Sequence, residues 1–246
     1  TGSLVVSKTN AGWVSLPALE TVGGSFEIAG NAKLDALWMP SLVAVDGSLV
    51  IESNHQLGAS QPDGDAERVV SVDLPTLERI GGDFRLELNT QLKSLTFHRL
   101  RDVGRGLGVV SNTAMWRMVL GSLGSVGLAC RNHDNSCGDL SIEGNSRLVV
   151  ASLPTLATIQ YDLRIAGNPV LETVQQRVDS VLGLHADFNS SLCERETLDP
   201  ILSRMWRLSR FPAKVYIYNN STEAGCRTRC PNESVGVCQI LGDKPS

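Results

Sequence analysis

Residues 16–31 read Leu-Pro-Ala-Leu-Glu-Thr-Val-Gly-Gly-Ser-Phe-Glu-Ile-Ala-Gly-Asn, and the same pattern returns five more times along the chain. Each copy ends on an asparagine, with Phe or Leu five residues before it and Leu or Met three residues after it. The intervals between these asparagines are 23, 35, 23, 33 and 23 residues. Self-similarity at a nearly fixed period predicts a solenoid of stacked coils. The asparagines are Asn31, Asn54, Asn89, Asn112, Asn145 and Asn168.

Apolar residues alternate with other residues just before each asparagine, which predicts one short strand per coil. Two side chains of each strand are expected to point inward: Phe26 and Ile28, Leu49 and Ile51, Phe84 and Leu86, Leu107 and Val109, Leu140 and Ile142, Leu163 and Ile165. Glycines before the strands permit the backbone angles that a corner needs. We interpret Gly104-Arg-Gly106-Leu-Gly108 in the same way, as a corner with close backbone packing.

The asparagines recur at one corner of the predicted coil, where a tight turn would otherwise leave backbone donors unpaired. We expect their side chains to hydrogen-bond backbone groups and the asparagines stacked next to them. This pattern predicts a structural asparagine ladder rather than a catalytic site.

The composition is that of a soluble globular chain, with 246 residues, 42% hydrophobic and 20% charged. A formal net charge of −4 argues against nucleic acid as a partner, because nucleic-acid binding requires a basic surface. No stretch approaches the roughly 20 apolar residues that span a bilayer. The start at Thr1 lacks the features of a signal peptide, as expected for a mature or trimmed ectodomain.

Six cysteines, all in the second half of the chain, predict disulfides and an oxidising compartment. They are Cys130, Cys137, Cys193, Cys226, Cys230 and Cys238, and Cys130–Cys137 is the pairing that we favour. Zinc held by the last three is the alternative, although no CxxC pair accompanies them. Possible glycosylation sites at Asn189, Asn219, Asn220 and Asn232 also fit an extracellular or cell-surface location.

The chain divides into a solenoid over residues 1–222 and a cysteine-containing tail over 223–246. Regular repeats occupy 2–175, with one polar insertion from Gly58 to about Arg68 and a second somewhere between Val119 and Cys137. Degenerate coils follow over 176–222, carried by Leu184 and Ala186 and later by Val215 and Ile217. Between them, residues 194–210 show helical periodicity, and we expect a helix that caps the solenoid end.

The run from Leu16 to Asn31, followed by Leu34 and Leu37 and repeated from Pro40 to Leu57, resembles the receptor L-domain family. Its members include the ligand-binding domains of the insulin and epidermal growth factor receptors, and similar repeats occur in fungal and bacterial surface proteins. The resemblance implies a mainly β fold, a short right-handed parallel β-helix of about six to eight coils with a helix and a disulfide-rich tail as caps. A leucine-rich-repeat horseshoe is the alternative, although that pattern has one residue fewer before its last leucine.

Outward strand positions are the candidate binding surface. On the stacked strands they include Glu52, Asp83, Arg85, Glu87, Glu143 and Arg164, and Trp38 is a further outward candidate. Glu52 and Glu87 are expected to be neighbours, because adjacent coils lie about 4.8 Å apart. A carboxylate pair of this kind serves as acid and nucleophile in glycosidases, but a solvated charged face is the simpler interpretation.

No cofactor or metal site is predicted, because the four histidines share no suitable spacing and no nucleotide or hydrolase motif occurs. The favoured function is a noncatalytic recognition module, receptor-like or an adhesin, that offers the sheet face and the insertion loops to an extracellular protein or glycan. The alternatives are a structural cell-surface or cell-wall spacer and, third, a polysaccharide-active β-helix enzyme.

Overall fold

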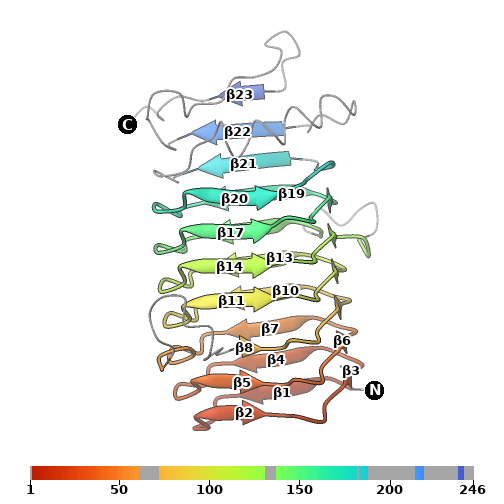
Figure 1. Ribbon diagram of the computed structural model, residues 1–246, viewed down its shortest axis with the longest axis vertical. Coiled ribbons are helices and arrows are strands. Elements are labelled where there is room, and N and C mark those ends of the chain that lie inside the picture. The colour runs from red at the N-terminus through yellow and green to blue at the C-terminus, as the bar shows by residue number, and fades with distance from the viewer. Residues whose placement is uncertain are drawn as a thin grey trace.

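The structure is a computed structural model that describes residues 2–60, 72–130, 137–181, 183–187, 214–218 and 238–240. Its largest element is a ten-stranded parallel sheet, which we call the long sheet (Figure 1). In spatial order the strands are β1 (Leu4–Ser7), β4 (Phe26–Ala29), β7 (Leu49–Glu52), β10 (Phe84–Glu87), β13 (Leu107–Val110), β16 (Leu140–Glu143), β19 (Asp162–Ala166), β21 (Gly183–Asp187), β22 (Lys214–Tyr218) and β23 (Cys238–Ile240).

Three further parallel sheets complete the coils. A six-stranded corner sheet contains β3 (Thr21–Val22), β6 (Ala44–Val45), β9 (Arg79–Ile80), β12 (Asp102–Val103), β15 (Ser125–Val126) and β18 (Thr158–Ile159). A three-stranded sheet contains β2 (Trp13–Ser15), β5 (Ala36–Trp38) and β8 (Val72–Asp73). A four-stranded sheet contains β11 (Ser94–Phe97), β14 (Arg117–Leu120), β17 (Val150–Leu153) and β20 (Thr173–Gln176).

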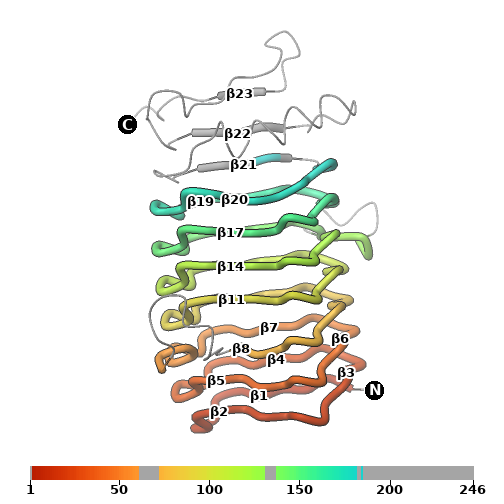
Figure 2. Tube along the Cα trace, viewed as in Figure 1, coloured from red at the N-terminus to blue at the C-terminus, as the bar shows by residue number. Residues whose placement is uncertain are grey.

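The prediction of a mainly β fold with parallel strands is confirmed, and the described part of the chain contains no helix. Its elongated stack of turns, seen along the Cα trace in Figure 2, is consistent with a β-solenoid. The helix predicted at 194–210 lies outside the described residues. Strand β23 falls within the range 223–246 that the sequence assigned to a tail, and it pairs with β22. Nowhere in the described ranges is there a helix with the length and hydropathy needed to cross a membrane.

The core runs through the middle of the stack, between the sheets. All twelve side chains predicted to point inward from the six strands that precede the repeat asparagines are at most 1% exposed. They lie in register because each strand pairs with the equivalent residues of the next, as Phe84 does with Leu107. The sequence period therefore predicts both the pairing register and the buried face of these strands.

The six repeat asparagines form a ladder along the stack, and each of them is fully buried. The backbone N–H and the Nδ2 of one asparagine both donate to the Oδ1 of the next, as between Asn31 and Asn54, at 3.0 Å each. Each Nδ2 also donates to a strand carbonyl in the coil before it, and for Asn112 that acceptor is the Leu86 oxygen at 2.7 Å. Thr9 occupies the equivalent position in the first coil, where its N–H and hydroxyl donate to Asn31 Oδ1.

The ladder continues across both insertions, because the Asn54 N–H donates to Asn89 Oδ1 and the Asn112 N–H donates to Asn145 Oδ1. The 35-residue interval exceeds the period of 23 by 12 residues. These extra residues fall between Leu57 and Val72, which are both buried, and Val72 pairs with Leu37 of the coil before. The 33-residue interval exceeds the same period by 10, which fall between Gly127 and Gly138. The favoured Cys130–Cys137 disulfide is present in this second insertion. Residues 61–71 and 131–136 are outside the described ranges, as are Cys193, Cys226, Cys230 and the four possible glycosylation sites.

Candidate functional site

The outward face of the long sheet brings together six of the seven candidate binding residues. Glu87 pairs with Glu52 on one side, as the sequence predicted, and with Val110 on the other. Val110 in turn pairs with Glu143, and Ser141 pairs with Arg164. Trp38 is separate from them, because it belongs to the three-stranded sheet.

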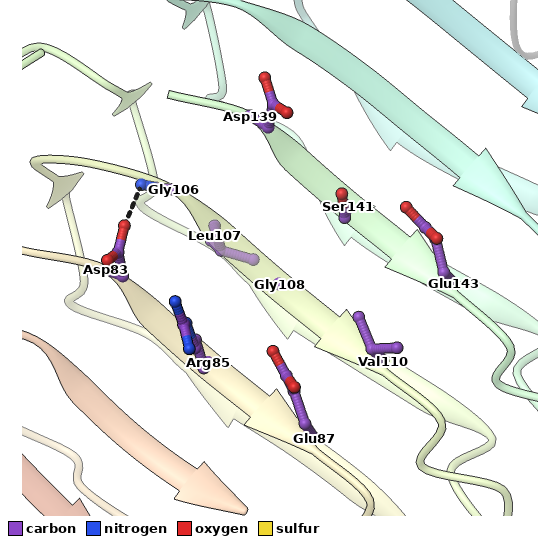
Figure 3. A pocket seen from close by; sticks show the side chains of 10 residues that line it. All are labelled: Asp83, Arg85, Glu87, Gly106, Leu107, Gly108, Val110, Asp139, Ser141 and Glu143. Atoms are coloured by element: carbon purple, nitrogen blue, oxygen red, sulfur yellow. Dashed lines mark hydrogen bonds between the residues drawn. The ribbon is translucent and has the colours of Figure 1, made fainter. Parts of the chain in front are cut away.

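A shallow groove of about 240 Å³ lies on this face over β10, β13 and β16 (Figure 3). It is lined by Asp83, Arg85, Glu87, Gly106, Leu107, Gly108, Val110, Asp139, Ser141 and Glu143. The surface is hollowed over β13, because outward Gly108 in this strand and Gly106 just before it have no side chains. The residues that pair with Gly108 on the adjacent strands, Arg85 and Ser141, do carry side chains, so the groove is the space left between them.

The three glycines of this segment have different surroundings. A Cβ added at Gly104 would lie 2.1 Å from the Gly81 carbonyl oxygen, so the predicted close backbone packing is confirmed there. At Gly108 an added Cβ would lie 3.7 Å from Glu87 Oε1, which is ordinary van der Waals contact, and at Gly106 it would lie 3.4 Å from Asp83 Oδ1. The prediction of close backbone packing is wrong for Gly106 and Gly108. The nearest backbone atom to a Cβ at Gly106 is the Asp139 carbonyl oxygen at 3.6 Å, and a Cβ at Gly108 would meet only side chains.

One end of the groove is built from carboxylates that stabilise the sheet. Asp83 Oδ1 accepts a hydrogen bond from the Gly106 N–H at 2.9 Å, and the Arg105 Nε lies 3.7 Å from the same oxygen. Asp139 Oδ1 accepts the Asp162 N–H at 3.0 Å. Ser25 Oγ and Ser48 Oγ likewise accept a backbone N–H from the next coil. The residues six positions before the asparagines therefore form a second line of hydrogen bonds between coils, in addition to the asparagine ladder. Sequence reasoning missed this second line, although a Ser or Asp six residues before the asparagine was visible in most copies.

The other end of the groove carries charged groups that the fold does not use. Arg85, Glu87 and Glu143 make no side-chain hydrogen bond or salt bridge with any other described residue. Arg164 differs, because its guanidinium lies 3.1 Å from Asp162 Oδ2 and 3.5 Å from Asp139 Oδ2. The groups available to a ligand are therefore one guanidinium and two carboxylates, beside a floor that Gly106, Gly108 and the Val110 side chain form.

The carboxylates that flank the groove are not the pair predicted from the sequence. Glu52 and Glu87 are neighbours in the sheet, but Glu52 does not line the groove. Glu87 and Glu143 flank it instead, two strand spacings or about 10 Å apart between Cα atoms. Across the described ranges, no three His, Cys, Asp or Glu residues are grouped so that they would hold a metal ion.

Trp38 lies between the inward residues Leu37 and Met39, and its side chain is exposed. Its neighbour on β8 is Asp73, and burial raises the pKa of that carboxyl above its usual value of 3.8. Because this pKa is raised in the folded state, the ionised Asp73 carboxylate destabilises the fold at pH values above it. This destabilisation is lost as the pH falls through the folded-state pKa towards 3.8, the usual value.

We therefore expect Asp73→Asn to raise the melting temperature slightly near neutral pH, because the amide removes a partly desolvated charge. The difference from the unmodified protein should shrink as the pH is lowered to about 3, where the native carboxyl is also neutral. Thermal unfolding followed by circular dichroism at several pH values measures this. A melting-temperature difference that does not change with pH would show that Asp73 acts through packing instead.

Comparisons of this chain with protein-family models, with curated proteins and with solved structures found no match in any of the three.

Proposed function

We propose that this protein is a noncatalytic recognition module of an extracellular or cell-surface protein, receptor-like or adhesive, that binds a protein or glycan ligand at the groove of the long sheet. The observation that carries the proposal is the glycine-floored groove beside Arg85, Glu87 and Glu143, whose charges have no partner among the described residues. Ligand sites are typically concave and present a few convergent polar groups, and this groove has both properties.

The proposal includes the finer features that the receptor L-domain resemblance implies. These are a right-handed β-helix of six to eight coils, a helical and disulfide-rich cap, and glycosylation in an oxidising compartment. The parallel sheets and the Cys130–Cys137 disulfide support it, because both are expected of such an ectodomain. The insertion that carries the disulfide is a second surface for the ligand, because loops on a rigid scaffold commonly carry binding residues.

A structural spacer is the alternative function, and the asparagine ladder favours it. A continuous line of buried hydrogen bonds is what a rigid rod requires, whatever the outer face carries. The groove distinguishes the recognition module from the spacer, because only the recognition module needs an open groove. A variant that fills the groove without weakening the coils is therefore the sharpest test.

We expect Gly108→Val to abolish ligand binding while stabilising the fold by about 0.5–1 kcal/mol, because glycine in a strand has a high entropic cost on folding. The Cβ of the new side chain has room, since it would lie 3.7 Å from Glu87 Oε1 and 3.9 Å from Val110 Cγ2, both ordinary van der Waals distances. It would occupy the space above the groove floor. Urea unfolding measures the stability, and an array of glycans and extracellular ectodomains measures the binding.

The matched control is Ala29→Val, which adds bulk to an outward position of β4 away from the groove. The charge-reversal pair Arg85→Glu with Glu87→Lys tests the same site without filling it. A hit that Gly108→Val and the charge reversal both lose, and that Ala29→Val keeps, supports recognition at the groove. A hit that all the variants keep contradicts recognition there, and the absence of hits for the unmodified chain favours the spacer.

A further inference from the structure

The outer face of the three-stranded sheet carries two large exposed aromatic side chains. Trp13 is 68% exposed and Trp38 is 42% exposed. In the register of β2 and β5, Trp13 pairs with Ala36 and Ser15 pairs with Trp38. The two tryptophans therefore occupy diagonal corners of one square of outward positions, with Cα atoms about 8 Å apart from the strand spacing and the rise per residue.

The exposure of these indoles follows from their neighbours. Ala36 and Ser15 fill the other two corners, and neither side chain is large enough to cover an indole ring. Val14 and Leu37 alternate with the outward residues and are buried or half-buried on the core side. Tryptophan is usually highly buried in folded proteins, so two open indoles on one small face are an unusual use of this residue.

The same face has one ionisable side chain in its three strands. Asp73 pairs with Trp38 on β8 and is half-buried beside it. No lysine or arginine belongs to β2, β5 or β8. The surface thus combines two flat apolar rings with a single carboxylate acceptor at its edge, and we call it the tryptophan strip (Trp13, Trp38 and Asp73).

We propose that the tryptophan strip binds an oligosaccharide, whose sugar rings stack on the two indoles while Asp73 accepts hydrogen bonds from sugar hydroxyls. A pyranose ring presents an apolar C–H face and a rim of hydroxyl donors, which matches apolar rings next to a carboxylate. The absence of cationic side chains from the three strands fits a neutral, hydroxyl-rich ligand rather than an acidic one.

The size of the strip favours a sugar over a protein partner. Three strands span about 10 Å, and the outward residues of β2 and β5 span about 7 Å along the strand. That is far below the roughly 800 Å² that each partner buries in a stable protein complex. The strip is also separate from the groove, because β2 and β5 lie in front of β1 and β4 in Figure 1, on the other side of the core. This inference therefore stands whether or not the groove binds a ligand.

To test for sugar binding at the strip, the full chain is titrated separately with four β-1,4-linked hexasaccharides, those of glucose, N-acetylglucosamine, xylose and mannose. Tryptophan fluorescence reports contact with the indoles, and isothermal titration calorimetry measures the affinity. We expect at least one sugar to bind saturably. Trp13→Ala and Trp38→Ala should each weaken that binding about tenfold, as for a central contact residue. Trp38→Phe should keep most of the affinity, because it retains an aromatic face.

Two control variants make the result specific to the strip. Trp116→Phe changes a half-buried tryptophan away from the strip, just before β14, and should leave sugar binding unchanged. Gly108→Val fills the groove and should also bind the sugar as the unmodified chain does. Loss of sugar binding in Gly108→Val alone would place the sugar in the groove and overturn the proposal.

Two other outcomes would also overturn it. One is that none of the four hexasaccharides binds saturably. The other is that the Trp13→Ala, Trp38→Ala double variant binds as well as the unmodified chain. If that double variant instead loses an ectodomain hit from the array while no sugar binds, the strip is a protein contact and not a glycan site.

Discussion

Asn112→Ala should lower the free energy of unfolding by about 3–5 kcal/mol, because it leaves several buried hydrogen-bonding groups without partners. The Asn112 Nδ2 donates to the Leu86 carbonyl at 2.7 Å and to the Val110 carbonyl at 3.2 Å. Its Oδ1 accepts the Asn89 N–H at 3.1 Å. Asn112 is fully buried, so water does not replace these contacts without local opening.

Urea unfolding followed by circular dichroism measures this loss. In a stacked array each coil is stabilised mainly by its neighbours, so a break in the middle should also make the transition less cooperative and reduce its slope. Thr113→Ala is the matched control, because the next side chain is exposed and makes a single 3.5 Å hydrogen bond. Equal midpoints for the two variants would show that the ladder does not stabilise the stack.

Phe84→Ala should destabilise the fold by about 3–5 kcal/mol, the cost of removing a large buried aromatic side chain and leaving a cavity. The Phe84 ring is fully buried, and its centroid lies 5.6 Å from that of Phe97, across the core from β10 to β11. Neighbouring coils in the stack carry Leu49 and Leu107 at the equivalent position. Phe84→Leu should therefore cost far less, about 1 kcal/mol.

The same unfolding measurement compares the two Phe84 variants. Their difference isolates the part of the ring that leucine does not replace, including its contact with Phe97. If alanine and leucine at this position gave similar stabilities, the coils around Phe84 would have to collapse into the space that the ring leaves. The core would then be less rigid than its repeated packing indicates.

The repeat predicted the strands of the long sheet and their register because a periodic sequence repeats one packing problem. Phe26 and Ile28 face the same surroundings as Leu49 and Ile51 one coil later, so a single alternating pattern predicts every inward pair. The ladder was predictable for the same reason. Its first member was not, because Thr9 lies 22 residues before Asn31 and differs from asparagine in type.

The groove was not predictable, because glycine has the same appearance in a sequence whether its surroundings are tight or open. Gly104 and Gly108 are four residues apart, yet only Gly104 lies against a neighbouring backbone carbonyl. The difference depends on what the adjacent coils place beside each glycine. The structural use of Asp83 was hidden in the same way, since its partner is the backbone N–H of Gly106 in the next coil.

The two insertions show where this chain tolerates changes of length. Gly127 and Gly138 flank the second one, and a Cβ added to Gly127 would lie only 2.6 Å from the Gly138 Cα, so the 10 intervening residues leave and re-enter the coil at almost one point. Doubling the length of a flexible loop with fixed ends costs only about 0.6 kcal/mol. Such a corner is a natural grafting point, at which segments of different length and chemistry can be exchanged while the coils on either side keep their spacing.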